Sequence, residues 1–150
     1  MIAMTVWVDA DSCPKRVRDI VIRAAEKRSV LARFISKQNA GVETGGNVES
    51  LVTEDDPDEI IVSRAEVGDL VVTRDIPLAA RLVEQDVVVL NTRGQVYDRE
   101  NVRERLSERD FMLELRSSAA FSEPGRKHGG REVGAFANAF DRELSKRLKE

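Results

Sequence analysis

Apolar runs and helical stripes alternate along the first ninety residues of the chain. Short apolar runs predict buried strands at residues 6–8, 30–35, 50–53, 70–73 and 87–90. Between and after these runs, apolar residues recur at helical spacing. This spacing predicts helices at residues 14–28, 58–66, 76–84, 99–116 and 131–149. Pro14 is typical of the first position of a helix, and Asp58 is a residue type that often provides an N-cap.

Strands that alternate with helices favour a parallel sheet covered on both faces. We therefore expect an α/β fold: a three-layer sandwich with a mostly parallel sheet, in which the last part of the chain forms helices. A length of 150 residues, of which 41% are hydrophobic, suits a single domain over residues 1–150. No apolar run approaches the roughly 20 residues of a membrane span, so we expect no membrane association.

Charge and cysteine content narrow the possible chemistry. The net charge of −3 gives no overall attraction to nucleic acid, although basic residues gather at 15–28 and 126–131. The single Cys13 cannot form an internal disulfide, and with the single His128 it cannot form a Cys/His zinc cluster. Since the N-terminus also lacks a signal pattern, we expect a cytoplasmic protein. Any metal would be held by oxygen ligands, which favours Mg²⁺ or Mn²⁺.

Several carboxylates follow predicted strands directly. Asp9 and Asp11 come after the first strand, Asp75 comes after the strand at 70–73, and Asp58 follows the third strand. Parallel sheets bind ligands outside the carboxyl ends of their strands, so these acids are predicted to share one edge. Asp69 instead precedes its strand. The six residues to Asp75 span about 20 Å when extended, which predicts a structural role for Asp69 at the opposite edge.

Acids that converge on one edge repel each other unless something relieves the repulsion. A divalent cation can do so, and so can raised pKa values together with basic neighbours. A magnesium or manganese ion would take a few carboxylates, several waters and phosphate oxygens of a substrate. The structural alternative is that Asp11 or Ser12 only supports the start of the first helix, near its positive dipole end.

Four strings stand out along the chain: VDADSCP at 8–14, GDLVVTRDIPLAARL at 68–82, LNTRGQVY at 90–97 and RDFMLELR at 109–116. Considered together, they resemble the YaiI/YqxD family of small bacterial proteins, whose biochemical activity is not settled. The resemblance covers nearly the whole chain, with Ser12 and Thr92 departing from the usual Ala and Pro. None of the departures removes an acid.

This family is similar in fold to PIN-like and NYN nuclease domains. The resemblance implies a parallel sheet in the order 3-2-1-4-5, which makes the first and fourth strands neighbours and turns Asp9 toward Asp75. In PIN-like nucleases the matching positions hold Mg²⁺ or Mn²⁺ for hydrolysis of RNA phosphodiesters. Asp58 is a further match at the start of the middle helix, whereas Asp11 belongs to the YaiI/YqxD string.

The leading hypothesis is therefore a Mg²⁺- or Mn²⁺-dependent phosphodiesterase, ribonuclease-like, with RNA as its partner. The predicted catalytic residues are Asp9, Asp11 and Asp75, and the predicted metal ligands are these three and Asp58. The basic residues expected to contact substrate phosphates are Lys15, Arg93 and Arg126.

Two alternatives remain open at this point. One is a nucleic-acid-binding or regulatory module that has this fold without catalysis, because a fold does not fix a function. The other is a haloacid-dehalogenase-type phosphatase, which would use Asp9 and Asp11 as its D-x-D pair. The second alternative is weakened by Gly68-Asp69, because the corresponding acid should follow a strand and here it precedes one. The sequence leaves the oligomeric state open.

Overall fold

The computed structural model describes residues 4–117 and 129–148. The strands are β1 (Thr5–Asp9), β2 (Leu31–Ser36), β3 (Val48–Val52), β4 (Leu70–Val72), β5 (Val88–Leu90) and β6 (Val96–Tyr97). The helices are α1 (Lys15–Arg28), α2 (Pro57–Arg64), α3 (Ile76–Glu84), α4 (Arg99–Ser117) and α5 (Gly130–Leu148), and a short 3₁₀ turn, η1 (Ala10–Ser12), links β1 to α1.

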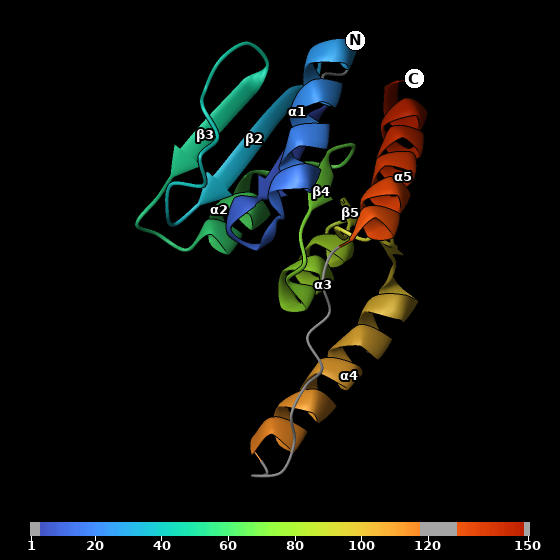
Figure 1. Ribbon diagram of the computed structural model, residues 1–150. Helices are drawn as coiled ribbons and strands as arrows, with labels where there is room; N and C mark the ends of the chain where they lie inside the picture. The colour runs from blue at the N-terminus through green and yellow to red at the C-terminus, as the bar shows by residue number, and fades with distance from the viewer. Residues whose placement is uncertain (1–3, 118–128, 149–150) are drawn as a thin grey trace.

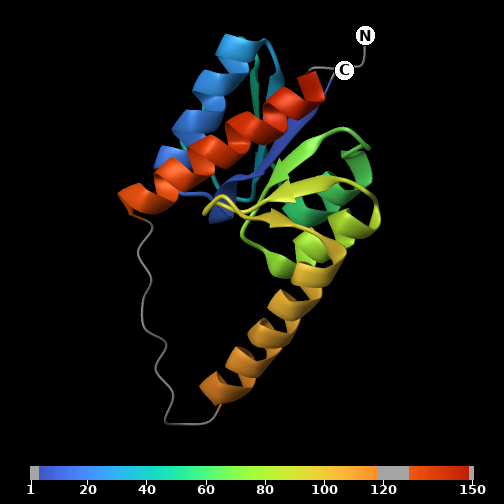
Figure 2. The ribbon, with the colours of Figure 1, turned by 90° about the vertical axis from the view of Figure 1, so that its right-hand side faces the viewer.

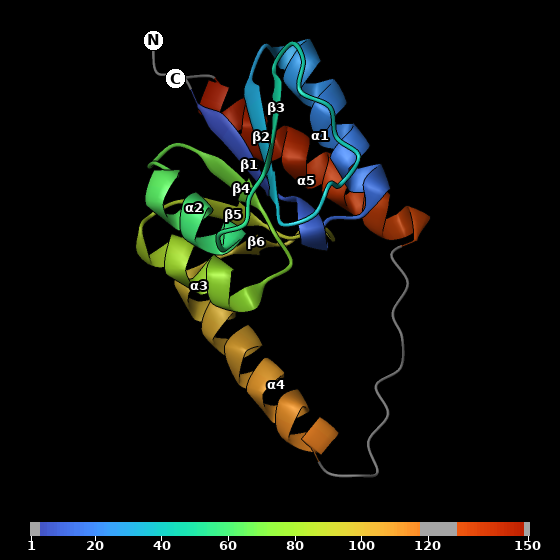
Figure 3. The ribbon, with the colours of Figure 1, turned by 90° about the vertical axis from the view of Figure 1, so that its left-hand side faces the viewer.

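The strands form one sheet in the order β3-β2-β1-β4-β5-β6, parallel except for β6. Helices α1 and α5 lie side by side on one face (Figure 2), and α2 and α3 cover the other (Figure 3). Helix α4 begins against α3 and then extends away from the rest of the molecule (Figure 1). The predicted α/β sandwich, the neighbouring first and fourth strands and the C-terminal helices are confirmed.

The two faces of β1 belong to different cores. Val6 and Val8 pack into the core beneath α1 and α5, whereas Trp7 packs into the core beneath α2 and α3. Side chains alternate between the faces of a strand, so Asp9, two residues after Trp7, is directed to the α2/α3 side. The pattern of strand β1 thus aims this carboxylate at the starts of α2 and α3.

Most predicted elements are confirmed, with ends shifted by one or two residues. The prediction that Asp58 caps its helix is wrong. Asp56 is the N-cap of α2, and its side chain accepts a hydrogen bond from the backbone N–H of Asp58 at 3.0 Å. Pro57 occupies the first helical position, where its missing N–H costs nothing. Asp58 therefore lies in the first turn, and its carboxylate is not used as the cap.

Asp69 has the structural role predicted for it at the edge opposite Asp75. Its buried carboxylate accepts hydrogen bonds from the backbone N–H of Thr5 at 2.9 Å and the indole N–H of Trp7 at 3.0 Å. It also accepts one from the backbone N–H of Glu66 at 2.9 Å. This acid ties the start of β1 to the turn before β4.

No helix in the described ranges is long and apolar enough to cross a bilayer.

Candidate functional site

Strands β1 and β4 are parallel neighbours, but the order in which strands are added to the sheet reverses between them. Strands β2 and β3 lie on one side of β1, and β4 and β5 lie on the other. Such a switch point is where open α/β sheets bind ligands. An open hollow of about 510 Å³ lies there. Its lining brings together acids from three elements: Asp9 from the end of β1, Asp58 from α2 and Asp75 from the start of α3. Asp11, Ser12, Pro57 and Arg74 complete the lining.

Asp9 is held firmly through one of its two carboxylate oxygens. Its Oδ2 accepts hydrogen bonds from the hydroxyls of Thr73 at 2.8 Å and Ser12 at 2.9 Å. Within the described ranges its Oδ1 accepts none. Only 6% of Asp9 is exposed, and this burial raises the pKa of its carboxyl above the usual 3.8, while the two hydroxyl bonds oppose the rise. Asp9 thus lines the hollow and, in the part of the chain that the structure describes, keeps one oxygen free of hydrogen bonds.

Asp75 is positioned as the N-cap of α3. Its Oδ1 accepts a hydrogen bond from the backbone N–H of Leu78 at 2.9 Å. Its own backbone N–H donates to the hydroxyl oxygen of Thr73 at 3.0 Å, so Thr73 links it to Asp9. The charge of Asp75 contributes to the raised pKa of Asp9. In the described ranges, neither Asp9 nor Asp75 forms an ion pair with a basic side chain.

Asp58 titrates far from its ordinary range. Partial burial raises the pKa of its carboxyl from 3.8 to about 7, and the nearby charges of Asp75, Asp9 and Asp56 add to the rise. A hydrogen bond with Asp75, which only protonated Asp58 can donate, acts in the same direction. A proton on Asp58 therefore relieves the repulsion between the acids when no cation is bound.

Stability should depend on pH through Asp58. The folded protein retains this proton up to about pH 7, whereas the unfolded chain releases it near the ordinary value of 3.8. The free energy of unfolding should therefore fall as pH rises from about 4 to 7. In buffer with EDTA, Asp58→Asn should raise that free energy at pH 8 by about 1 kcal/mol, a value reduced for the solvent screening of a half-exposed group. Urea denaturation of both proteins at pH 5 and pH 8 measures this, and an equal difference at both pH values would contradict it.

The structure distributes the other predicted site residues differently. Asp11 lines the hollow, but its Oδ2 accepts a hydrogen bond from the backbone N–H of Lys37 at 2.7 Å, which ties η1 to the end of β2. Lys15 is an exposed side chain that pairs with Asp19 at 3.1 Å, outside the lining. Arg93 lines a neighbouring hollow, and Arg126 lies outside the described residues.

Sequence reasoning did not assign Ser12, Thr73 or Arg74 to the site. The hydroxyls of Ser12 and Thr73 hold Asp9, and the exposed Arg74 follows Thr73 at the rim of the hollow. They could have been assigned from the sequence because they lie next to the acids in the strings VDADSCP and TRDIPLA. Only the pairing of β1 with β4 shows that Thr73 reaches across to Asp9.

The donor chemistry of the hollow fits a hard divalent cation, but the ligands are not pre-arranged. Across residues 4–117 and 129–148, no group of three or more His, Cys, Asp or Glu side chains is placed to hold a metal ion. Two observations favour a cation nonetheless: the uncommitted Oδ1 of Asp9 and the proton that Asp58 retains against its neighbours. A cation would have to displace that proton and draw the carboxylates inward.

Comparison with known proteins identifies the family of the chain. A family model described as "Uncharacterized BCR, YaiI/YqxD family" matches residues 7–146. A "UPF0178 protein" of Treponema pallidum is 44% identical over 149 residues, which cover 97% of this chain and 84% of that protein. Proteins with the same name from Myxococcus xanthus and Syntrophobacter fumaroxidans are 43% and 38% identical, each with 97% of both chains covered. The chain therefore belongs to the YaiI/YqxD family.

Proposed function

We propose that the hollow between β1, α2 and α3 is the catalytic centre of a ribonuclease-like phosphodiesterase that requires Mg²⁺ or Mn²⁺. The observation that carries the proposal is the convergence of Asp9, Asp58 and Asp75 from three elements at the switch point of the sheet. The repulsion between these carboxylates is relieved by a proton rather than by an arginine, and their negative charge can attract a cation.

Asp9, Asp58 and Asp75 are the residues that would hold the cation. When bound, such an ion polarises a phosphate and lowers the pKa of a water for in-line attack. Asp11 supports the site from the side, because its carboxylate is bonded to the backbone of Lys37. No histidine base is required in this chemistry, which agrees with a chain that has a single histidine.

The remaining roles follow from the contacts of the lining residues. Thr73 and Ser12 orient Asp9 and keep its Oδ1 directed away from their own hydroxyls. Asp58, with a pKa of about 7 in the metal-free site, would give up its proton when a cation binds. Arg74 lies at the rim and can bind a phosphate oxygen of the substrate through its guanidinium.

A calorimetric titration combined with a cleavage assay tests the proposal. Wild type should bind Mn²⁺ and release nucleotides from generic RNA in a metal-dependent reaction, and Asp9→Asn/Asp75→Asn should lose both properties. The matched control is Asp19→Asn, because Asp19 lies on α1 on the other face of the sheet and pairs with Lys15. Equal Mn²⁺ binding by wild type and the double variant would contradict the site. Cation binding without RNA cleavage would favour the non-catalytic binding module instead.

A further inference from the structure

A second hollow, of about 250 Å³, adjoins the acidic one. Arg74 lines both hollows, so they share a wall. The second is bordered by the start of α3, the β5–β6 turn and α4. Its charged lining residues are all arginines: Arg74, Arg93 and Arg105. The polar side chains of Asn91, Gln95 and Tyr97 face the same space. The sheet edge thus places an acidic site and a cationic site next to each other.

The turn that carries Arg93 is held rigidly. The side-chain oxygen of Asn91 accepts hydrogen bonds from the backbone N–H groups of Arg93 and Gln95, both at 2.9 Å. Gly94 has a φ of +90°, and a Cβ there would lie 2.5 Å from the carbonyl oxygen of Ala135 on α5. Only glycine fits so close to the backbone of α5. The position of Arg93 is therefore fixed by local hydrogen bonds and by packing of the turn against α5.

Arg105 is joined to the same turn from α4. Its Nη2 donates a hydrogen bond to the side-chain oxygen of Gln95 at 2.7 Å, and its Nη1 lies 3.7 Å from Glu108. Arg93 lies 3.5 Å from the carboxylate of Glu132. In the described ranges, Arg74 forms neither an ion pair nor a side-chain hydrogen bond. Three arginines therefore line one space. Arg93 and Arg105 are ion-paired with Glu132 and Glu108, residues that do not line this space, so an anion here would meet an excess of positive charge.

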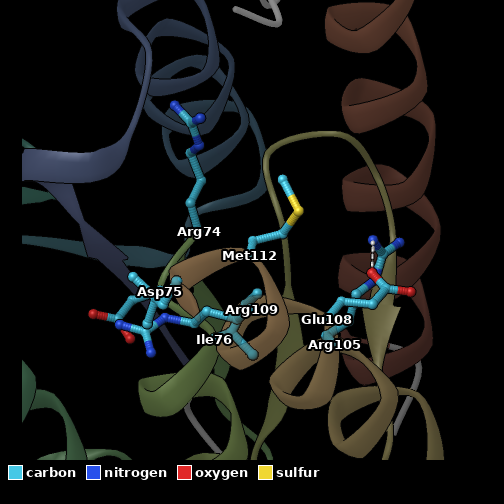
Figure 4. A pocket seen from close by; sticks show the side chains of 8 residues that line it. Arg74, Asp75, Ile76, Arg105, Glu108, Arg109 and Met112 are labelled. Atoms are coloured by element: carbon cyan, nitrogen blue, oxygen red, sulfur yellow. Dashed lines mark ion pairs between the residues drawn. The ribbon is translucent and has the colours of Figure 1, made fainter. Parts of the chain in front are cut away.

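Arginines continue along α4 into a third hollow, of about 420 Å³, whose lining also includes the acids Asp75 and Glu108. Figure 4 shows Arg74, Asp75 and Ile76 with Arg105, Arg109 and Met112 of α4 around this space. Arg109 is exposed, and among the described residues it pairs with the neighbouring Asp110 at 3.9 Å. The three hollows thus form a continuous surface that runs from the acids past several arginines. A ligand with phosphates in a row matches this surface better than a single phosphomonoester does.

We propose that the Arg74–Arg93–Arg105 pocket binds the phosphate next to the scissile phosphate of a single nucleic-acid strand. The assignment of this pocket as a substrate subsite rests on the proposed function, whereas its affinity for phosphate does not. Guanidinium groups bind phosphate oxygens in pairs, and neighbouring amides and hydroxyls can add neutral hydrogen bonds. Tyr97, the aromatic residue of the lining, is only 7% exposed, so the pocket offers no surface on which a base could stack. The pocket should therefore contact the phosphate backbone and not the bases.

Binding without metal tests the pocket separately from catalysis. The probe is a fluorescein-labelled 12-nucleotide RNA strand, or DNA of the same sequence, measured by anisotropy with the full chain in EDTA. Arg93→Ala/Arg105→Ala should weaken RNA binding about tenfold. The slope of the logarithm of the binding constant against the logarithm of the salt concentration should become shallower by about 0.7 for each arginine–phosphate pair removed. Arg103→Ala is the matched control, because Arg103 is exposed on the same helix and lines none of the three hollows.

Arg74→Ala provides a second variant that removes no ion pair or side-chain hydrogen bond within the described residues. It should weaken binding severalfold with an unchanged melting temperature, so a folding defect in the double variant would not leave the test undecided. Equal affinity of Arg74→Ala and Arg103→Ala would overturn the pocket, and so would failure of wild type to bind either strand. Loss of cleavage in Asp9→Asn with RNA binding intact would separate the two sites. If wild type binds RNA through these arginines but never cleaves it, the proposed catalysis fails and the phosphate site stands.

Discussion

Replacing Asp9 with asparagine is expected to lower metal-dependent RNA cleavage by at least about 100-fold, because it removes a negatively charged ligand from the centre of the site. Loss of an outer-sphere partner alone typically costs 10- to 100-fold in metal affinity or activity, so loss of a direct ligand should cost more. In Asp9→Asn the uncommitted Oδ1 can be replaced by an amide N–H₂, which repels a cation instead of binding it.

The same substitution should leave the fold intact. Both hydroxyl donors, Thr73 and Ser12, bond to a single oxygen of Asp9, and the amide oxygen of asparagine can accept both. Burial raises the pKa of Asp9, so the ionised carboxylate weakens the folded state at pH values above its folded-state pKa. A neutral amide removes that penalty. The free energy of unfolding of Asp9→Asn at pH 8 should therefore equal or exceed that of wild type.

Cleavage rates with saturating Mn²⁺ and urea denaturation in EDTA measure the two halves of this prediction. Asp19→Asn serves as the control and should keep the wild-type cleavage rate, because its carboxylate pairs with Lys15 and lies outside the lining of the hollow. A fall in activity that is matched by a fall in stability would mean that Asp9 is a structural acid. Unchanged cleavage in a folded Asp9→Asn protein would remove it from the catalytic site.

Asp69→Ala should show the reverse behaviour and destabilise the protein by about 3 kcal/mol. The variant leaves three donors without their acceptor: the backbone N–H groups of Thr5 and Glu66 and the buried indole N–H of Trp7. Each unsatisfied buried donor costs roughly 1–3 kcal/mol, and water can satisfy part of this loss for the two less buried backbone groups. Asp69 is 6% exposed, the same fraction as Asp9, so burial alone does not distinguish the two acids.

The free energy of unfolding from urea denaturation at pH 8 measures this loss, with Asp19→Ala as a surface control expected to stay within about 0.5 kcal/mol of wild type. Cleavage per folded molecule should be unchanged in Asp69→Ala at a temperature below its midpoint, because this acid lies at the opposite edge of the sheet. A small stability loss together with a large activity loss would reassign Asp69 to the reaction.

The edge positions of Asp9, Asp69 and Asp75 could be predicted from the sequence because each depends only on whether an acid precedes or follows a strand. The local rule failed for Asp58. An Asp that opens a helix is a reasonable cap, but the preceding Asp56 together with Pro57 takes that role. This difference matters for function, since a capping Asp58 would have used the carboxylate that instead meets Asp75.

The arginine pocket could not be predicted as a unit. Arg74, Arg93 and Arg105 lie on three elements far apart in sequence, and only the sheet order and the docking of α4 against α3 bring them together. Strand β6 was also missed, because its two residues pair with β5 in a tight turn set by Asn91 and Gly94 and carry little periodicity of their own. Tertiary contacts, rather than local pattern, define these features.

A crystal soaked in Mn²⁺ at pH 8, above the pKa of about 7 of Asp58, tests the proposed metal site directly. We expect an anomalous peak in contact with carboxylate oxygens of Asp9 and Asp75, with Asp58 drawn toward it, and no such peak in Asp9→Asn crystals. Wild-type crystals that show no manganese between these acids at saturating concentration, or show it bound only elsewhere, would refute the site.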